Sequence, residues 1–209
     1  MLANLQFRAA TSRDAKLIAP LIYSSGPAAF DYIFSHGTAL NAIEFLTRTL
    51  EQPSGEFGYR NHRIAQIDGE IVGVATSFTG RESFSFLLAA IWQILKNYGP
   101  IKSPGIMRRG LQIESIISPP EKDEYCIAHV GVHPDFRRKG IGRQIMKNMV
   151  QEGQKAGYQK LILDVSAENP GALALYESLG FNRVRHNAST LRNSTAIIPD
   201  HIRMEYQQK

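Results

Sequence analysis

A basic, glycine-containing turn between a strand pattern and a helix pattern is the feature that most constrains this fold. The apolar run Cys126 to Val132 predicts a strand, and Pro134 cannot continue a central strand. The turn from 137 to 142 reads Arg-Arg-Lys-Gly-Ile-Gly, and apolar residues recur at helical spacing from Ile141 onward. Its two glycines let the backbone turn tightly, and the first N–H groups of a helix lack intrahelical partners. The junction therefore predicts a site for an anion such as phosphate.

The elements that follow this helix predict a parallel pair of strands. Gly157 ends the helix near Lys155, and Leu161 to Val165 is a short apolar strand. A second helix follows from Pro170, a residue well placed in a first helical turn, to Ser178. A strand, a helix of about fifteen residues and another strand form a βαβ unit, which implies parallel pairing and a right-handed crossover.

Two familiar phosphate-binding motifs do not fit this turn. A Rossmann fingerprint needs three glycines and an acidic residue about twenty positions later. The turn here has two glycines, although Asp164 does lie in the next strand at roughly that distance. No Gly-Lys-Ser/Thr follows the glycines, which excludes a Walker A loop. Taken alone, the turn is also compatible with a solvated basic loop.

Two linked stretches resemble the GNAT superfamily of acetyl-CoA-dependent N-acetyltransferases, most densely over residues 124 to 182. Arg137, Gly140 and Gly142 match the family's acetyl-CoA motif, Gln/Arg-x-x-Gly-x-Gly/Ala. Downstream, residues 174–181 read Ala-Leu-Tyr-Glu-Ser-Leu-Gly-Phe, which is similar to bacterial acetyltransferases that modify ribosomal-protein N termini. The resemblance implies an α/β fold with a central mixed twisted sheet and helices on both faces. It also implies transfer of an acetyl group from acetyl-CoA directly to a primary amine, without a metal.

The amino-terminal half agrees with this fold. Its predicted elements are a strand at Leu5 to Ala9, a helix capped by Thr11 or Ser12 and running through Ile22, a helix at Leu40 to Leu50, and strands at about Tyr59 to Ile67 and Ile71 to Phe78. Asp68-Gly69 joins the last two strands as a hairpin. We expect one domain over residues 1–209.

A helical insertion at about residues 80–123 departs from the family's compact pattern. It predicts two helices separated by a break at Tyr98 to Pro100. The insertion either lies over the acceptor cleft or enlarges the core. Residues 84–95 are apolar on more than one face, which favours burial or a partner, and they are too few to span a bilayer.

The resemblance implies which residues hold the cofactor. Main-chain N–H groups of Arg138, Lys139, Gly140, Ile141, Gly142 and Arg143 would bind the pyrophosphate, with the side chains of Arg137, Arg138 and Lys139 neutralising it. Val130, Gly131 and Val132 would offer main-chain groups to the pantetheine arm. Asn169 would also reach this arm, or cap the following helix, or do both.

Catalysis needs a proton donor for the leaving thiol and a base for the amine. Tyr176 occupies the position where the family keeps its acid, although it also suits a packed aromatic. Asp164, where the ribosomal-protein acetyltransferases keep a glutamate, and Glu124 are the candidate bases. His129 is a rival, and alternation places it opposite Glu124 unless a bulge intervenes. Cys126, the one cysteine, is expected to be an inert buried thiol.

Composition bounds the partners. The net charge of +5 invites a nucleic-acid partner, but the cations are dispersed and lack interleaved aromatic residues, so we expect none. No long apolar segment or leader pattern is present, so we expect no membrane partner and a cytoplasmic location. A homodimer is left open. The alternative function is a non-catalytic module that binds acyl-CoA or another protein.

Overall fold

The strands form one mixed sheet. The computed structural model describes residues 4–206. Within them the strands are β1 (Leu5–Ala9), β2 (His62–Ile67), β3 (Glu70–Thr79), β4 (Glu124–Val132), β5 (Lys160–Ser166), β6 (Phe181–Asn187) and β7 (His201–Tyr206). The sheet order is β1-β2-β3-β4-β5-β7-β6. β4 and β5 pair in parallel, as the βαβ pattern predicted, and the other neighbours are antiparallel.

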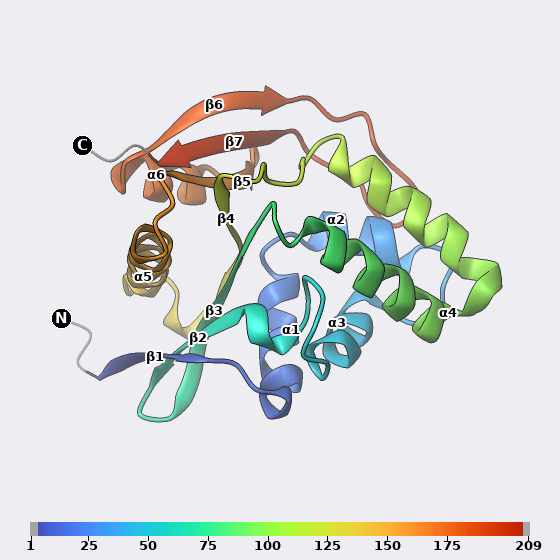
Figure 1. Cartoon of the computed structure of the whole chain (residues 1–209), viewed down its shortest axis with the longest axis horizontal. Coiled ribbons are helices and arrows are strands. Elements are labelled where there is room, and N and C mark those ends of the chain that lie inside the picture. Colours follow the sequence, from blue (N-terminus) through green and yellow to red (C-terminus); the bar gives the residue numbers. More distant parts are fainter. Residues whose placement is uncertain (1–3, 207–209) are drawn as a thin grey trace.

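Helices cover both faces of the sheet, which confirms the predicted fold class (Figure 1). They are α1 (Ala15–Tyr23), α2 (Pro27–Phe30), α3 (Ala42–Leu50), α4 (Ser83–Glu114), α5 (Ile141–Lys155) and α6 (Pro170–Ser178). One apolar core joins α5 and α6 to the sheet, and a second joins α1 and α3 to the opposite face. β2 and β3 contribute residues to both cores, so this part of the sheet lies between them.

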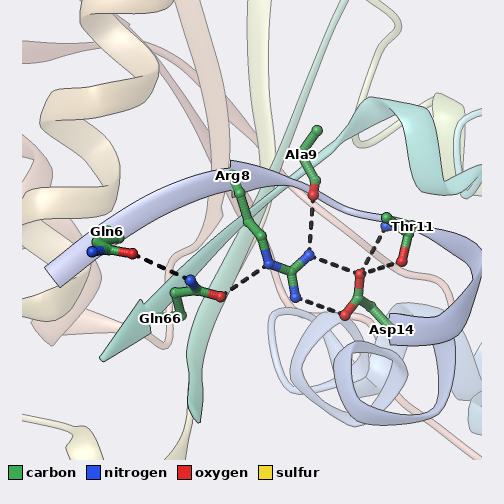
Figure 2. A network of polar contacts seen from close by, with 6 residues as sticks. All are labelled: Gln6, Arg8, Ala9, Thr11, Asp14 and Gln66. Atoms are coloured by element: carbon green, nitrogen blue, oxygen red, sulfur yellow. Dashed lines mark hydrogen bonds and ion pairs between the residues drawn. The ribbon is translucent and has the colours of Figure 1, made fainter. Parts of the chain in front are cut away.

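A polar network fixes the turn from β1 into α1. The Asp14 carboxylate accepts hydrogen bonds from both terminal nitrogens of Arg8, each at 2.8 Å, and from the main-chain N–H of Thr11 at 2.8 Å. Arg8 also donates from Nε to the Gln66 side chain on β2 at 2.9 Å. Figure 2 shows how Arg8 links the helix start to two strands. These bonds hold the pKa of Asp14 at about 2, chiefly through Arg8.

The insertion forms the predicted pair of helices. α4 breaks at Gly99, whose φ of 71° and ψ of 171° are not helical, and the chain then turns back on itself (Figure 1). The second half is fixed by Arg109, which donates to the main-chain oxygens of Ile33 and His36. Ile94 and Ile106, one from each half, join the core on the α1 face. Neither half, nor any other described helix, has the length and apolar character needed to cross a bilayer.

The structure corrects the predicted boundaries at one strand and adds elements that were not predicted. Residues Tyr59–Asn61 form a 3₁₀ turn, so β2 begins three residues later than expected. Between α1 and α3 lie α2 and a short π-helical turn, Asp31–Ser35. β6 and β7 were also missed. β7 inserts between β5 and β6, so the sheet continues beyond the βαβ unit.

Candidate acetyl-CoA and acceptor site

The predicted anion-binding junction has the expected backbone. After β4, a 3₁₀ turn at Pro134–Phe136 leads into the basic loop, and α5 begins at Ile141. Arg138 and Gly140 adopt positive φ angles of 57° and 81°. The turn packs Gly142 against the side chains of Leu175 and Val132, 3.6 and 3.7 Å from the position a Cβ would take. The loop is thus bent sharply at the amino end of α5.

The loop presents main-chain donors, and its cations divide between two tasks. The first hydrogen bond that closes α5 runs from Gln144 N to Gly140 O, so the three preceding N–H groups point out of the helix end. Arg138 and Lys139 are exposed. Arg143, by contrast, donates to the Ser178 hydroxyl at 2.7 Å and ties α5 to α6. The junction fits a polyanionic group such as a pyrophosphate.

The strands that flank this junction separate. β4 and β5 pair only from Glu124 to Cys126, and beyond this point β4 pairs with β3 while β5 pairs with β7. Val130, Gly131 and Val132 lie on the part of β4 that has parted from β5. A Cβ at Gly131 would lie 2.2 Å from the Leu21 carbonyl oxygen, so α1 crosses β4 in direct backbone contact. Arg137 donates from Nε to the Val132 oxygen at 3.1 Å.

Asn169 caps α6 and Tyr176 lies within it, and α6 contacts the start of α5 through Leu175 and Ser178. Asn169 caps α6, because its side-chain oxygen accepts from the Ala172 N–H at 3.1 Å. Tyr176 packs against the core on the α5 face, with its ring 6.1 Å from that of Phe181. Burial raises the pKa of Tyr176 to about 12. The phenol therefore stays protonated at neutral pH, which is the state that a proton donor requires.

Asp164, one of the two expected bases, forms a buried ion pair. Its carboxylate accepts from Arg203 of β7, at 2.8 Å from Nη2 and 3.2 Å from Nε. The side chains are 5% and 9% exposed. Arg203 also donates to the Ser118 carbonyl at the end of the insertion. Arg203 thus occupies both carboxylate oxygens of Asp164, and these contacts suit a structural ion pair.

Glu124, the other expected base, lies where β4 and β5 are still paired. It is 7% exposed, and its Oε2 accepts from the Glu121 N–H at 2.8 Å. Lys160, its ladder partner on β5, places Nζ 4.0 Å from Oε1. Cys126 lies two residues further along and is buried, which raises the pKa of its thiol well above the usual range. These contacts suit anchoring of the strand end.

A bulge in β4 brings His129 into a polar pair that the sequence did not reveal. His129 has a positive φ of 51°, and the register with β3 shifts at this point. Its Nε2 lies 3.0 Å from the Glu56 carboxylate, and its ring lies 5.6 Å from Phe30 and 5.3 Å from Phe57. Bonding to a carboxylate makes Nε2 the donor and leaves Nδ1 as an acceptor. Phe30 belongs to the core opposite that of Tyr176, so His129 and Tyr176 pack on different faces of the sheet.

His62, at the start of β2, lies near His129. It is fully buried, which lowers its pKa to about 3, and the nearby His129 adds to the shift. Its Nδ1 donates to the Gly58 oxygen at 3.0 Å. Over residues 4–206, no group of three or more histidines, cysteines, aspartates or glutamates is arranged to hold a metal ion.

Comparison with known proteins identifies the family. The model of the acetyltransferase (GNAT) family matches residues 32–181. The chain is 43% identical over 67 residues to the [ribosomal protein bS18]-alanine N-acetyltransferase of Escherichia coli strain K12, covering 31% of this chain and 45% of that protein. The match thus spans less than half the length of this relative.

Solved structures agree on the fold. An N-acetyltransferase from Staphylococcus aureus Mu50 superimposes with a TM-score of 0.70 at 17% identity, covering 96% of this chain and 99% of the other. The yncA protein of Salmonella typhimurium, solved with its cofactor acetyl-CoA, gives a TM-score of 0.57 at 14% identity, covering 98% and 94%. The resemblance seen in the sequence is confirmed, and the chain belongs to the GNAT family of acetyltransferases.

Proposed function

We propose that this protein transfers the acetyl group of acetyl-CoA to a primary amine. The observation that carries the proposal is the junction of β4 and α5, where a sharply bent cationic loop meets a helix amino terminus beside two parting strands. Acetyl-CoA would supply an activated thioester. The main chain from Arg138 to Arg143 would bind its pyrophosphate, and the free part of β4 would pair with its amide arm.

Proton transfer completes the reaction. The amine nitrogen forms a bond to the acetyl carbon, the carbon–sulfur bond breaks, and one proton leaves the nitrogen while one reaches the sulfur. Tyr176 is proposed to donate its proton to the sulfur, since its raised pKa keeps the phenol protonated. The same burial away from water would make the leaving thiolate more basic. His129 is proposed to accept the amine proton at Nδ1, with Glu56 stabilising the imidazolium.

His129 is preferred over the two carboxylates because of their contacts. Asp164 is neutralised by Arg203, and Glu124 lies at the paired end of the strands. Both remain candidate bases that kinetics can test. The relatives that acetylate a ribosomal protein alanine support including a peptide with a free N-terminal alanine among the acceptors tried.

An acceptor screen that follows release of free thiol from acetyl-CoA tests the proposal. The panel should contain peptide N termini, lysine peptides, polyamines, aminoglycosides and amino acids. Tyr176→Phe should lower kcat by about 100-fold or more, since a positioned acid contributes at least that much. Tyr158→Phe is the matched control, because that ring packs on Tyr125 away from the loop. Turnover of Tyr176→Phe within about twofold of the parent would contradict the acid assignment.

The base is tested in the same assay by pH. His129→Gln should lower kcat and remove the fall of kcat at acidic pH, since that fall reports protonation of the base. Acetyl-CoA titration of this variant should give an unchanged Kd. A pH profile of the parent shape in His129→Gln would return the role to one of the carboxylates.

A further inference from the structure

The first half of α4 exposes an apolar stripe that no described part of the chain covers. Its members recur at helical spacing along one side: Phe84, Leu87, Leu88, Trp92 and Leu95, with exposed fractions of 71, 48, 53, 54 and 43%. We call these five residues the α4 stripe. At the tip of the hairpin, Ile101 is 93% exposed. Figure 1 shows the hairpin at an edge of the molecule.

Attachment of the helix to the domain does not use this side. Phe86 packs on Phe78, with ring centroids 5.6 Å apart, and Gln93 donates to the Ser54 oxygen at 3.1 Å. Ile94 is 8% exposed in the core. At 100° per residue, residues 86 and 93 lie opposite the stripe, and residue 94 lies at its border next to Leu87. The helix is therefore already anchored, and the stripe is left for something outside the domain.

The side chains around the α4 stripe are mostly cationic, and their charge indicates what kind of partner the stripe binds. Arg81, Lys96, Lys102 and Arg108 are exposed along the hairpin, and Lys96 places its Nζ 4.7 Å from the Trp92 ring centre. Of the two glutamates within residues 81–114, Glu82 accepts from the Thr79 N–H, and Glu114 lies at the far end of the second half. An apolar helix side bordered by cations fits an anionic lipid surface.

A second copy of the chain fits this surface poorly. The stripe begins beside Arg81 and ends beside Lys96, so antiparallel pairing of two copies would bring like charges together at both ends. Its length is about 18 Å at one helix width. Such a strip is well below the roughly 800 Å² that each partner buries in a stable interface.

We propose that the α4 stripe docks the protein on the surface of an anionic lipid bilayer. Phe84, Leu88 and Trp92 enter the boundary between headgroups and acyl chains, and the flanking cations contact lipid phosphates. The expectation of no membrane partner came from the lack of a long apolar segment, which bears on spanning a bilayer and leaves surface binding open. The proposal does not depend on the acetyl transfer proposed above.

Trp92 reports directly on this docking, because it is the one tryptophan of the sequence. Full-length protein is titrated with vesicles of phosphatidylcholine containing phosphatidylglycerol, and with vesicles of phosphatidylcholine alone. Binding to the anionic vesicles should shift the Trp92 emission to the blue and carry the protein into the floating fraction of a gradient. Raising the salt concentration should weaken this binding.

Two substitutions at exposed positions give the matched comparison. Leu88→Asp should weaken binding by about tenfold or more, since it places a carboxylate against anionic lipid. Ile197→Asp, at a 73% exposed residue between β6 and β7, should leave binding unchanged. Absence of a blue shift with anionic vesicles, or equal weakening by both variants, would overturn the proposal. So would a dimer in solution that Leu88→Asp dissociates, because a second copy would then cover the stripe.

Discussion

Replacing Asp164 with asparagine separates a structural role of this carboxylate from a catalytic one. The substitution keeps the shape of the side chain and removes the negative charge opposite Arg203. Both side chains are almost fully buried, at 5 and 9% exposure, so solvent cannot compensate the arginine. We therefore expect the main effect on stability.

The contacts set the size of that effect. Removing one partner of a buried ion pair costs about 3–5 kcal/mol. Arg203 keeps its bond to the Ser118 carbonyl, and the asparagine oxygen can accept one of the former bonds, so the lower end applies, about 3 kcal/mol. For a domain of this size, that loss lowers Tm by about 6–12 °C.

Thermal and denaturant unfolding measure the loss, and kcat is then measured well below the Tm of the variant. Asp135→Asn is the control, because that side chain is 83% exposed and should change stability by at most about 0.5 kcal/mol. The double variant Asp164→Leu with Arg203→Met should recover stability, since a buried pair can be replaced by apolar groups. An unchanged Tm in Asp164→Asn, with a kcat about 100-fold lower and no acidic fall in its pH profile, would refute this reasoning and make Asp164 the base.

Two further predictions concern the scaffold. The pKa of Asp14 lies at about 2, below its ordinary value, so its bonds to Arg8 stabilise the fold above about pH 4, and this contribution is lost as the pH falls through 2. Asp14→Asn should cost about 1–2 kcal/mol at pH 7 and only a few tenths of a kcal/mol, about 0.4, at pH 2 in denaturant unfolding. An equal cost at both pH values would contradict this. Gly131→Ala should cost about 1–3 kcal/mol of stability, because the new Cβ would meet the Leu21 carbonyl. Gly142→Ala, whose Cβ would make only ordinary contacts, should be neutral or stabilising. Equal unfolding midpoints for the two variants would argue against the close crossing of α1 over β4.

The part of the fold predicted best is the part whose signals are local. The strand before the basic loop, α5, β5 and α6 each carry their own periodicity and end signals, and their predicted bounds are confirmed to within a residue or two. β6 and β7 lacked such signals. β6 is mostly exposed, so its sequence has no buried face to recognise. β7 carries Arg203 in the interior, a position that makes sense only with Asp164 opposite it, 39 residues earlier.

The insertion was predicted in outline, and its surroundings decide which side is buried. Apolar residues on more than one side of residues 84–95 indicated burial or a partner, and the structure buries one side of the helix and leaves another side exposed. Ile94 joins the core, while Trp92, two residues away, is half exposed. The periodicity of the sequence indicates that the first half of α4 has two different sides. Only the packing partners Phe78 and Ser54 reveal which side faces the domain.

The same distinction separates the two halves of the proposed site, because the donor half has local sequence signals and the acceptor half has none. A phosphate cradle is made by the main chain of one strand–loop–helix junction, so its glycines and cations are contiguous from Arg137 to Arg143. The proposed acceptor side is assembled from side chains far apart in sequence: Glu56 meets His129 across 73 residues, and Phe30 contacts His129 from a third segment. Each of these residues has an ordinary structural role when taken alone. Because no single segment carries the signal for this side, the acceptor has to be found by screening amines with the folded protein, and His129→Gln is the variant that tests whether His129 takes part.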